Sequence, residues 1–247
     1  MLTVGSLFSG IGGFDLGFER AGFDIRWQVE IDPFCRAVLS RHWPKVAQYE
    51  DVRTVGEQNL ERVDCLIGGF PCQDISYAGA GAGLDGERSG LWAEYRRIIR
   101  ELGPRIVVVE NVAALLQRGI GRVLGDLAGI GFDAEWSLLS ACALGLPHPR
   151  QRLFVVAYAD SQHGRPWLRD SYARAFRPLQ EIDRFAGARA GYRARLENPS
   201  ALYGGADGIS DGSQRNRGIG NSVAPDVAQW IAERILLAES GVGKDQP

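Results

Sequence analysis

The chain has 247 residues, of which 45% are hydrophobic and 23% are charged. These values are typical of a folded globular protein, and the length allows one large α/β domain or one domain with a small appendage. The formal net charge of -2 excludes the overall basic excess of many nucleic-acid-binding proteins, but residues 150–217 hold 12 Arg against 7 Asp and Glu, a local surplus of basic charge.

The cysteines and the N-terminus indicate the compartment. Cys35, Cys65, Cys72 and Cys142 form neither a CxxC pair nor a histidine spacing typical of a zinc site. A chain of this size has no need of disulfides, so we expect reduced thiols. The first basic residue is Arg20, and no apolar run approaches the ~18 residues of a membrane span. We therefore expect a cytoplasmic protein that does not bind a membrane.

Short apolar runs alternate with helix-like segments over the first 160 residues. The runs predicted as strands are 2–8, 25–30, 63–67, 106–110 and 153–158. One intervening segment places its apolar side chains on a single helical face, namely Leu91, Tyr95, Ile98, Ile99 and Leu102. This alternation predicts βαβ units and a parallel sheet, which binds ligands at the carboxyl ends of its strands.

The last third of the chain has a different character. Between residues 160 and 218, Gly, Arg, Asp and Ser dominate and apolar periodicity is poor. An apolar stripe then predicts a helix that packs back on the first domain, with Pro225 near its start. The stripe consists of Val223, Val227, Trp230, Ile231 and Ile235. We expect a catalytic and cofactor-binding domain over 1–160, a small loop-rich insert over 161–217, and this C-terminal helix within 218–247.

The first predicted strand runs into the glycine-rich turn Phe8-Ser9-Gly10-Ile11-Gly12-Gly13. Glycines let the backbone approach a ligand closely, and the N-terminus of the following helix offers N–H groups. The dinucleotide pattern GxGxxG would require glycine at position 15, which is Asp15, so hydride transfer loses its main support. Glu30 ends the second predicted strand, where an acid can bind the ribose hydroxyls of a nucleotide-type cofactor. Such an acid is more often an ordinary cap or surface residue.

A thiol and a carboxylate follow two neighbouring predicted strands. Cys72 lies in a glycine-bounded turn and precedes a Gly- and Ala-rich run that reaches Gly90. At such a place a thiolate can be an exposed nucleophile, whereas a lone cysteine is more often a buried structural residue. A loop of this length is usually a lid or a binding loop. Glu110 ends the next strand, so both groups are predicted at one edge of the sheet.

Four motifs, in this order, resemble those of the C5 DNA cytosine methyltransferase family. They are Phe70-Pro71-Cys72-Gln73, Glu110-Asn111-Val112, the Pro-His-Pro-Arg-Gln-Arg run over 147–152, and Gly220-Asn221-Ser222-Val223. Each motif is modest alone, but four in the family's order are specific. The resemblance implies a Rossmann-like S-adenosylmethionine-dependent α/β fold with a mostly parallel sheet and a small insert. It also implies a DNA (cytosine-5)-methyltransferase that acts on double-stranded DNA.

The resemblance assigns the catalytic roles. Cys72 matches the nucleophile that adds to cytosine C6, and Glu110 matches the carboxyl group that binds or protonates N3. Arg150 and Arg152 support the site, and Arg152 matches the arginine that contacts the pyrimidine. The cofactor is S-adenosylmethionine, and no metal is required. The positions that match cofactor-binding residues are Phe8, Gly10, Gly12, Glu30 for the ribose, Asp51 for the adenine edge, Pro71, Asn221 and Val223.

The resemblance also implies that the target cytosine is flipped out of the duplex, because C5 and C6 lie inside the base stack. Gln73, Ser76 and Arg88 are expected to contact DNA, and residues 76–90 occupy the place of the family's closing loop. The insert over 161–217 is shorter than the recognition region of most relatives and lacks their Arg-Glu motif. His148 replaces the usual Gln, a change that we expect activity to survive.

Two alternatives remain open at this stage. A tRNA cytosine methyltransferase of the same fold would carry Pro-Pro-Cys and Cys-Phe-Thr, whereas this chain has Phe70-Pro71-Cys72 and no Cys-Phe-Thr. A non-catalytic cofactor- or DNA-binding module would need a partner chain, but the joint presence of Cys72, Glu110 and Arg152 argues against it. We expect a monomer of bacterial or phage type, with a restriction endonuclease of a restriction-modification system or a helper subunit as the partners left open.

Overall fold

The computed structural model describes residues 1–71, 90–141, 151–159 and 222–240. A seven-stranded sheet of order β3-β2-β1-β4-β5-β7-β6 runs through this part of the chain. The strands are β1 (Thr3–Leu7), β2 (Asp24–Val29), β3 (Ala47–Tyr49), β4 (Cys65–Gly69), β5 (Ile106–Val112), β6 (Phe132–Ser140) and β7 (Gln151–Ala159). Strands β1 to β5 are parallel, and β7 is antiparallel to both of its neighbours. The mostly parallel sheet predicted from the sequence is confirmed.

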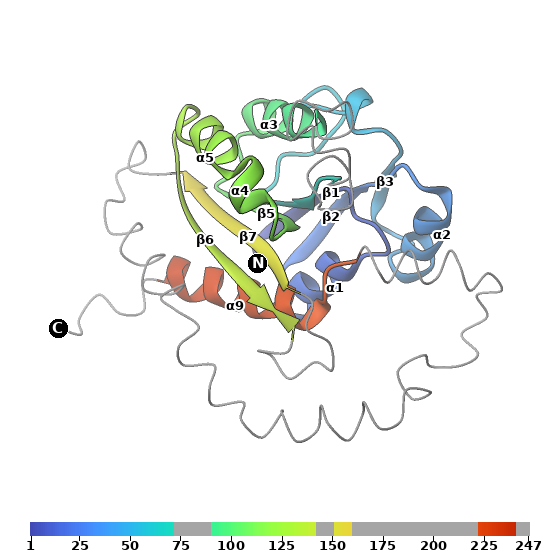
Figure 1. Cartoon of the computed structure of the whole chain (residues 1–247). Helices are drawn as coiled ribbons and strands as arrows, with labels where there is room; N and C mark the ends of the chain where they lie inside the picture. Colours follow the sequence, from blue (N-terminus) through green and yellow to red (C-terminus); the bar gives the residue numbers. More distant parts are fainter. Residues whose placement is uncertain (72–89, 142–150, 160–221, 241–247) are drawn as a thin grey trace, which may run out of the picture.

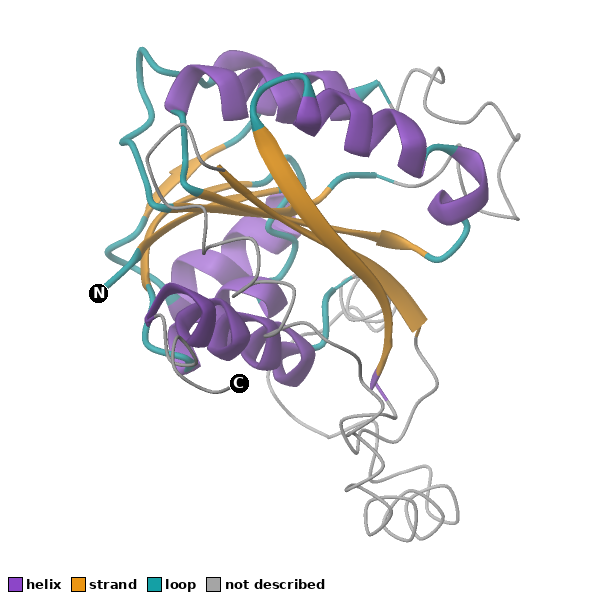
Figure 2. Cartoon of the chain, turned by 90° about the vertical axis from the view of Figure 1, so that its left-hand side faces the viewer, coloured by secondary structure: helices purple, strands orange, loops and turns teal. Residues whose placement is uncertain are grey.

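Helices cover both faces of this sheet (Figure 1 and Figure 2). On one face lie α3 (Leu91–Leu102), α4 (Leu115–Arg118) and α5 (Ile120–Ala128), and on the other lie α1 (Gly13–Arg20) and α9 (Pro225–Ser240). Helix α2 (Pro33–His42) follows β2, and the short 3-10 helix η1 (Val52–Thr54) follows β3. None of the described helices has the length and apolar character needed to cross a lipid bilayer.

The central strands are buried from both sides. In β5, Val107 and Val109 pack toward the α3 face, while Ile106 and Val108 pack toward α1 and α9. Helix α3 buries the predicted stripe except Leu91, and Trp92 joins it. Because a strand covered on both faces needs apolar side chains at every position, such strands are visible in the sequence as unbroken apolar runs.

Two strands did not appear among the predicted runs. Strand β3 has three residues, too few for a pattern, and β6 lies at the edge of the sheet with Trp136 52% exposed. Strands β6 and β7 follow one another in the chain and pair antiparallel. The predicted alternation of parallel strands and helices therefore holds only as far as β5. Strand β7 also begins earlier than the predicted run, which places Arg152 inside the strand.

Helix α9 packs against α1, and a glycine makes the close approach possible. A Cβ atom on Gly17 would overlap the side chain of Ala228 and the backbone of Pro225 and Gln229. The helix buries Val227, Ile231 and Ile235 in the same cluster as Phe14 and Phe18 of α1. The insert predicted over 161–217 lies outside the described residues, so the division into domains stays a prediction.

We expect Gly17→Ala to lower the free energy of unfolding by about 1–3 kcal/mol, because the new methyl group forces α1 and α9 apart. Gly125→Ala on α5 is the matched control, since nothing lies within 4 Å of its Cβ position. There alanine should stabilise the helix by about 0.5–1 kcal/mol. Urea denaturation of the three proteins measures both effects. Equal stabilisation by the two substitutions would contradict the packing of α9 on α1.

Candidate functional site

The predicted site residues that the structure describes gather at the carboxyl ends of the parallel strands. Phe8 follows β1, Glu30 follows β2, Pro71 follows β4, and Glu110 lies in the last part of β5. Because β1, β2, β4 and β5 run in parallel, these ends share one edge of the sheet. Open α/β sheets bind their ligands at this edge.

The turn after β1 has an unusual backbone. Phe8 has φ +53° and is the only non-glycine residue with positive φ in the part of the chain described above. Gly10 and Gly12 have φ +57° and +84°, a region that other residues adopt only with strain. Gly12 also lacks room for a side chain, because a Cβ atom would overlap the ring of Trp43. Strained backbone of this kind concentrates at ligand-binding turns.

Glu30 holds this turn in place. Its Oε2 accepts a hydrogen bond from the backbone N–H of Gly10 at 2.7 Å, and its Oε1 accepts one from the N–H of Asp32 at 2.9 Å. Burial raises the pKa of the Glu30 carboxyl, and the two backbone N–H groups oppose the rise. A carboxylate has about four lone-pair sites, so Glu30 keeps capacity for ligand hydroxyls beside these two contacts.

A buried polar cluster lies beneath the turn. Asp15 of α1 is fully buried and accepts hydrogen bonds from the Ser6 hydroxyl at 3.1 Å and the Gln28 amide at 2.9 Å. Ser9 donates to the Ser6 hydroxyl at 2.9 Å, and its backbone N–H bonds to the Val29 carbonyl at 3.1 Å. The cluster therefore joins β1, β2 and α1 just where the glycine turn begins.

Glu110 forms an ion pair across the sheet. Arg152 Nε lies 3.0 Å from Glu110 Oε1, with the side chains 25% and 10% exposed. In the β5–β7 register Glu110 faces Phe154 and Arg152 faces Val112, so the pair is a diagonal contact on one face of the sheet. Opposite on β4 is Gly69, which leaves the carboxylate room that a side chain would fill.

Asn111 connects this ion pair to the segment that leads to Cys72. Its side-chain amide donates a hydrogen bond to the Phe70 carbonyl at 3.1 Å, and its Oδ1 accepts one from the Val112 N–H at 2.9 Å. Asn111 is 2% exposed. The amide therefore fixes the chain two residues before Cys72.

The two cysteines within the described residues are poor nucleophiles. Burial raises the pKa of the Cys35 thiol to about 12, and the nearby Glu30 and Asp32 carboxylates add to the rise. Burial likewise raises the pKa of Cys65 well above its usual value. Thiols of this kind stay protonated near neutral pH and are inert.

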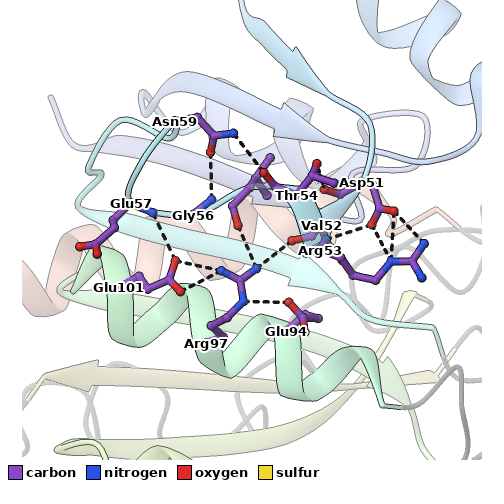
Figure 3. A network of polar contacts seen from close by, with 11 residues as sticks. Asp51, Val52, Arg53, Thr54, Gly56, Glu57, Asn59, Glu94, Arg97 and Glu101 are labelled. Atoms are coloured by element: carbon purple, nitrogen blue, oxygen red, sulfur yellow. Dashed lines mark hydrogen bonds and ion pairs between the residues drawn. The ribbon is translucent and has the colours of Figure 1, made fainter.

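Asp51 lies beyond β3 and is held by its neighbour. Its carboxylate caps η1 by accepting the Arg53 N–H at 2.9 Å, and it pairs with the Arg53 guanidinium at 2.7 Å (Figure 3). Hydrogen bonds from the Arg53 side chain lower the pKa of Asp51. Asp51 is therefore a fixed, ionised acceptor at the end of β3.

The C-terminal motif reaches the same region. Val223 is 8% exposed and packs in the cluster formed around α1. A Cβ atom on Gly13 would overlap the Ser222 hydroxyl and the Val223 carbonyl. The Ser222-Val223 segment therefore lies against the first residue of α1, next to the glycine turn.

The remaining predicted residues lie outside the described part of the chain. These are Cys72, Gln73, Ser76, Arg88, Arg150 and Asn221. Within the described part, no group of three or more His, Cys, Asp or Glu side chains is placed to hold a metal ion.

Sequence reasoning assigned no role to Asn111 or to the cluster around Asp15. Asn111 is part of the motif Glu110-Asn111-Val112, so the sequence showed where it stands in the chain. The sequence did not show that its amide bonds to the Phe70 carbonyl. Asp15 had one signal, because it is an ionisable residue between Phe14 and Phe18 on a helix that is otherwise apolar at its buried positions.

Comparisons with known proteins point to one protein family. The family model described as C-5 cytosine-specific DNA methylase matches residues 2–185. Type II methyltransferase M.NgoPII of Neisseria gonorrhoeae is 36% identical over 163 residues, which cover 64% of this chain and 48% of the relative. Type II methyltransferase M.AquIA of Picosynechococcus is 34% identical over 172 residues, 61% of this chain and 69% of the relative. M2.BsuMI of Bacillus subtilis is 35% identical and is covered over 42% of its length. The chain spans about half the length of most of these relatives.

Solved structures share the fold. A protein described as a DNA modification methyltransferase encoded within an E. coli prophage superposes with a TM-score of 0.56 at 28% identity, over 66% of this chain and 48% of that one. Spodoptera frugiperda DNMT2 superposes with a TM-score of 0.55 at 21% identity, over 64% and 50%. The second likeness shows the fold alone.

Asp15 predicts a dependence of stability on pH. Burial raises the pKa of its carboxyl from 3.8 to about 6, against opposing hydrogen bonds from Gln28 and Ser6. Below pH ~6 the folded protein takes up a proton that the unfolded chain binds only near its ordinary pKa. The contribution of Asp15 to the free energy of unfolding therefore rises as the pH falls from about 7 to about 4, by on the order of 3 kcal/mol.

Asp15→Asn removes this titration, so the wild type should gain stability relative to the variant on acidification in urea denaturation experiments. Asp24→Asn is the control for the change of net charge, since Asp24 is a half-exposed residue of β2. Stability curves of wild type and Asp15→Asn that stay parallel from pH 7 to pH 4 would contradict the assignment.

Proposed function

The chain belongs to the C-5 cytosine-specific DNA methylase family, and we propose that it transfers a methyl group from S-adenosylmethionine to C5 of a flipped-out cytosine in double-stranded DNA. One observation carries the proposal. The Glu110–Arg152 ion pair lies at the sheet edge where Asn111 holds the Phe70 carbonyl, directly before Pro71 and Cys72. The Glu110 carboxyl group and the Arg152 guanidinium thus lie near the segment that leads to Cys72.

The chemistry uses the thiol and the carboxyl group directly. Cytosine C5 is a poor nucleophile, and the Cys72 thiolate activates it by forming a bond to C6. A carboxyl group at N3 helps by hydrogen bonding to the ring or protonating it, so that electron density leaves C6 as sulfur adds. This role is proposed for Glu110. Transfer of the methyl group to C5 would leave S-adenosylhomocysteine as the product. Removal of the C5 proton by a base would then re-form the C5–C6 double bond as the bond between C6 and the Cys72 sulfur breaks.

Arg152 and Arg150 complete the proposed active site. Arg152 keeps its guanidinium within 3.0 Å of Glu110, so it is placed to orient that carboxyl group and to present further N–H donors to a pyrimidine. Arg150 lies two residues earlier, outside the described residues, and is proposed to support the same site.

The glycine turn fits the cofactor. S-adenosylmethionine supplies the activated methyl group when it is bound. Nothing lies within 4 Å of the Cβ position of Gly10, so the backbone there is open to a ligand. We assign the cofactor site to Phe8, Gly10, Gly12, Glu30, Asp51, Pro71, Asn221 and Val223. Glu30 would bind the ribose hydroxyls and Asp51 the adenine edge.

The DNA-binding side of the proposal rests on residues outside the described part. Gln73, Ser76 and Arg88 would contact the DNA, and the insert over 161–217 would read the target sequence, with its arginines on phosphates. The curated relatives are named Type II methyltransferases. This favours a cytoplasmic, bacterial or phage setting within a restriction-modification system, with a cognate endonuclease as partner and a monomeric chain.

We expect the chain to methylate C5 of cytosine when it is produced in a bacterial host that lacks methylation of its own. Base-resolution mapping of the host DNA should reveal a fixed short context, and Cys72→Ala should abolish the signal because it removes the nucleophile. Scattered methylation would mean that the insert binds DNA without reading it. A folded protein that binds cofactor but methylates only RNA, or neither nucleic acid, would overturn the proposal in favour of the alternatives.

We expect Glu110→Gln to lower kcat by about 10²-fold or more, because the amide keeps the shape of the carboxyl group but cannot transfer a proton to N3. Cofactor affinity, measured by isothermal titration calorimetry, should stay within about twofold of the wild type, since Glu110 is assigned to the base and not to the cofactor. A variant with normal kcat would show that the carboxyl group has no part in the reaction.

A further inference from the structure

Arg97 of α3 occupies the centre of a polar network that joins this helix to the segment after β3 (Figure 3). Its Nη2 donates hydrogen bonds to the carbonyl of Val52 at 3.0 Å and to that of Val55 at 2.8 Å. Both carbonyls belong to η1 or to the residue that ends it. A single side chain therefore holds two points of the backbone that follows Asp51.

Two acids of the same helix fix the guanidinium. Arg97 Nε lies 2.8 Å from Glu94 Oε2, and its Nη1 lies 2.9 Å from both oxygens of Glu101. Glu101 in turn accepts the backbone N–H of Glu57 at 3.2 Å. Each nitrogen of the guanidinium thus has a partner, and the planar group cannot turn without breaking several hydrogen bonds.

The segment itself is tightly built. The Asp51 carbonyl accepts hydrogen bonds from the backbone N–H and the hydroxyl of Thr54, at 3.0 and 2.8 Å. The Asn59 side chain bonds to the Gly56 N–H at 2.9 Å and to the Thr54 carbonyl at 3.1 Å. Because the turn is stiff, holding the Val52 and Val55 carbonyls also fixes the position of Asp51 relative to α3.

The other side of α3 supports the rest of the same site. The Tyr95 ring stacks on Phe8 with centroids 6.3 Å apart, and the Trp92 ring lies 5.6 Å from Phe70. The Tyr95 hydroxyl donates a hydrogen bond to the Val108 carbonyl of β5 at 3.1 Å. Helix α3 thus contacts residues after β1 and β4 through aromatic rings and the residues after β3 through Arg97.

We propose that Arg97 is a positioning residue for the adenine side of the cofactor site. It sets the distance between Asp51 and the glycine turn by tying the backbone after Asp51 to the helix on which Phe8 rests. Arg97 touches neither cofactor nor substrate in this role. The inference rests on the proposed function, because it takes Asp51 as the residue that meets the adenine edge.

Two variants and a control separate positioning from general stability. Arg97→Met keeps the aliphatic stem, and Val52, Val55 and Leu60 remain buried at 5%, 1% and 5% exposure to hold the segment on the core. Arg97→Lys keeps the charge, but its one ammonium group replaces three separate nitrogens, so it cannot bond the two carbonyls and both acids at the same time. Arg96→Met is the control, since Arg96 is the preceding residue of α3 and pairs with Asp126 of α5, away from the segment.

The probe is S-adenosylhomocysteine, titrated calorimetrically into the chain of 247 residues. We expect Arg97→Met to raise its Kd about tenfold, the equivalent of about 1.4 kcal/mol. In methylation assays the KM for S-adenosylmethionine should rise by a similar factor while kcat changes less than about twofold. Arg97→Lys should keep the wild-type melting temperature but show an intermediate Kd, and Arg96→Met should bind as the wild type does.

Hydrogen–deuterium exchange of residues 52–60 in the cofactor-free protein gives a readout that does not depend on activity. Exchange should be faster in Arg97→Met than in Arg96→Met. Faster exchange with an unchanged Kd would overturn the inference and leave the proposed function intact, as would unchanged exchange. A wild-type protein that fails to bind S-adenosylhomocysteine would overturn the proposed function itself.

Discussion

Burial of both faces of the parallel sheet is the constraint on which the rest of this structure depends. With α3, α4 and α5 on one side and α1 and α9 on the other, β4 and the first half of β5 can carry only apolar side chains and glycine along their length. Polar chemistry is therefore concentrated at the strand ends, where Glu30 and Glu110 lie with Phe8 and Pro71. The same burial that stabilises the fold thus concentrates the site at one edge.

The polar groups that do enter the interior all serve that edge. Asp15 joins β1, β2 and α1 under the glycine turn, and Asn111 ties β5 to the Phe70 carbonyl. A buried polar group without partners would cost free energy, so each of these side chains specifies one arrangement of its neighbours. Glu30 does the same from outside the core by holding the Gly10 N–H. Hydrogen bonds from these side chains therefore hold the site in place together with the packing of the core.

The features of the fold that depend on a local pattern of residues could be predicted from the sequence. The buried strands were visible as apolar runs, and the ends of these runs placed Glu30, Pro71 and Glu110 at strand ends. It could not show β6, because an edge strand with Trp136 half exposed has no unbroken apolar run. Nor could it show that Arg97 meets Val52 and Val55, since these contacts join residues more than 40 positions apart. Arg97 stands on a helical surface where an arginine looks like any other solvated charge.

The diagonal contact between Glu110 and Arg152 has a consequence for how this chain can change. The two side chains meet because Arg152 faces Val112 in an antiparallel register. An insertion or deletion of one residue within β7 would turn Arg152 to the opposite face of the sheet, whatever residue was added. Substitutions along β7 can weaken the ion pair by degrees, whereas a change in the length of β7 by one residue removes it completely. The ion pair therefore requires a constant number of residues within β5 and β7. Differences in chain length between relatives have to lie outside these two strands.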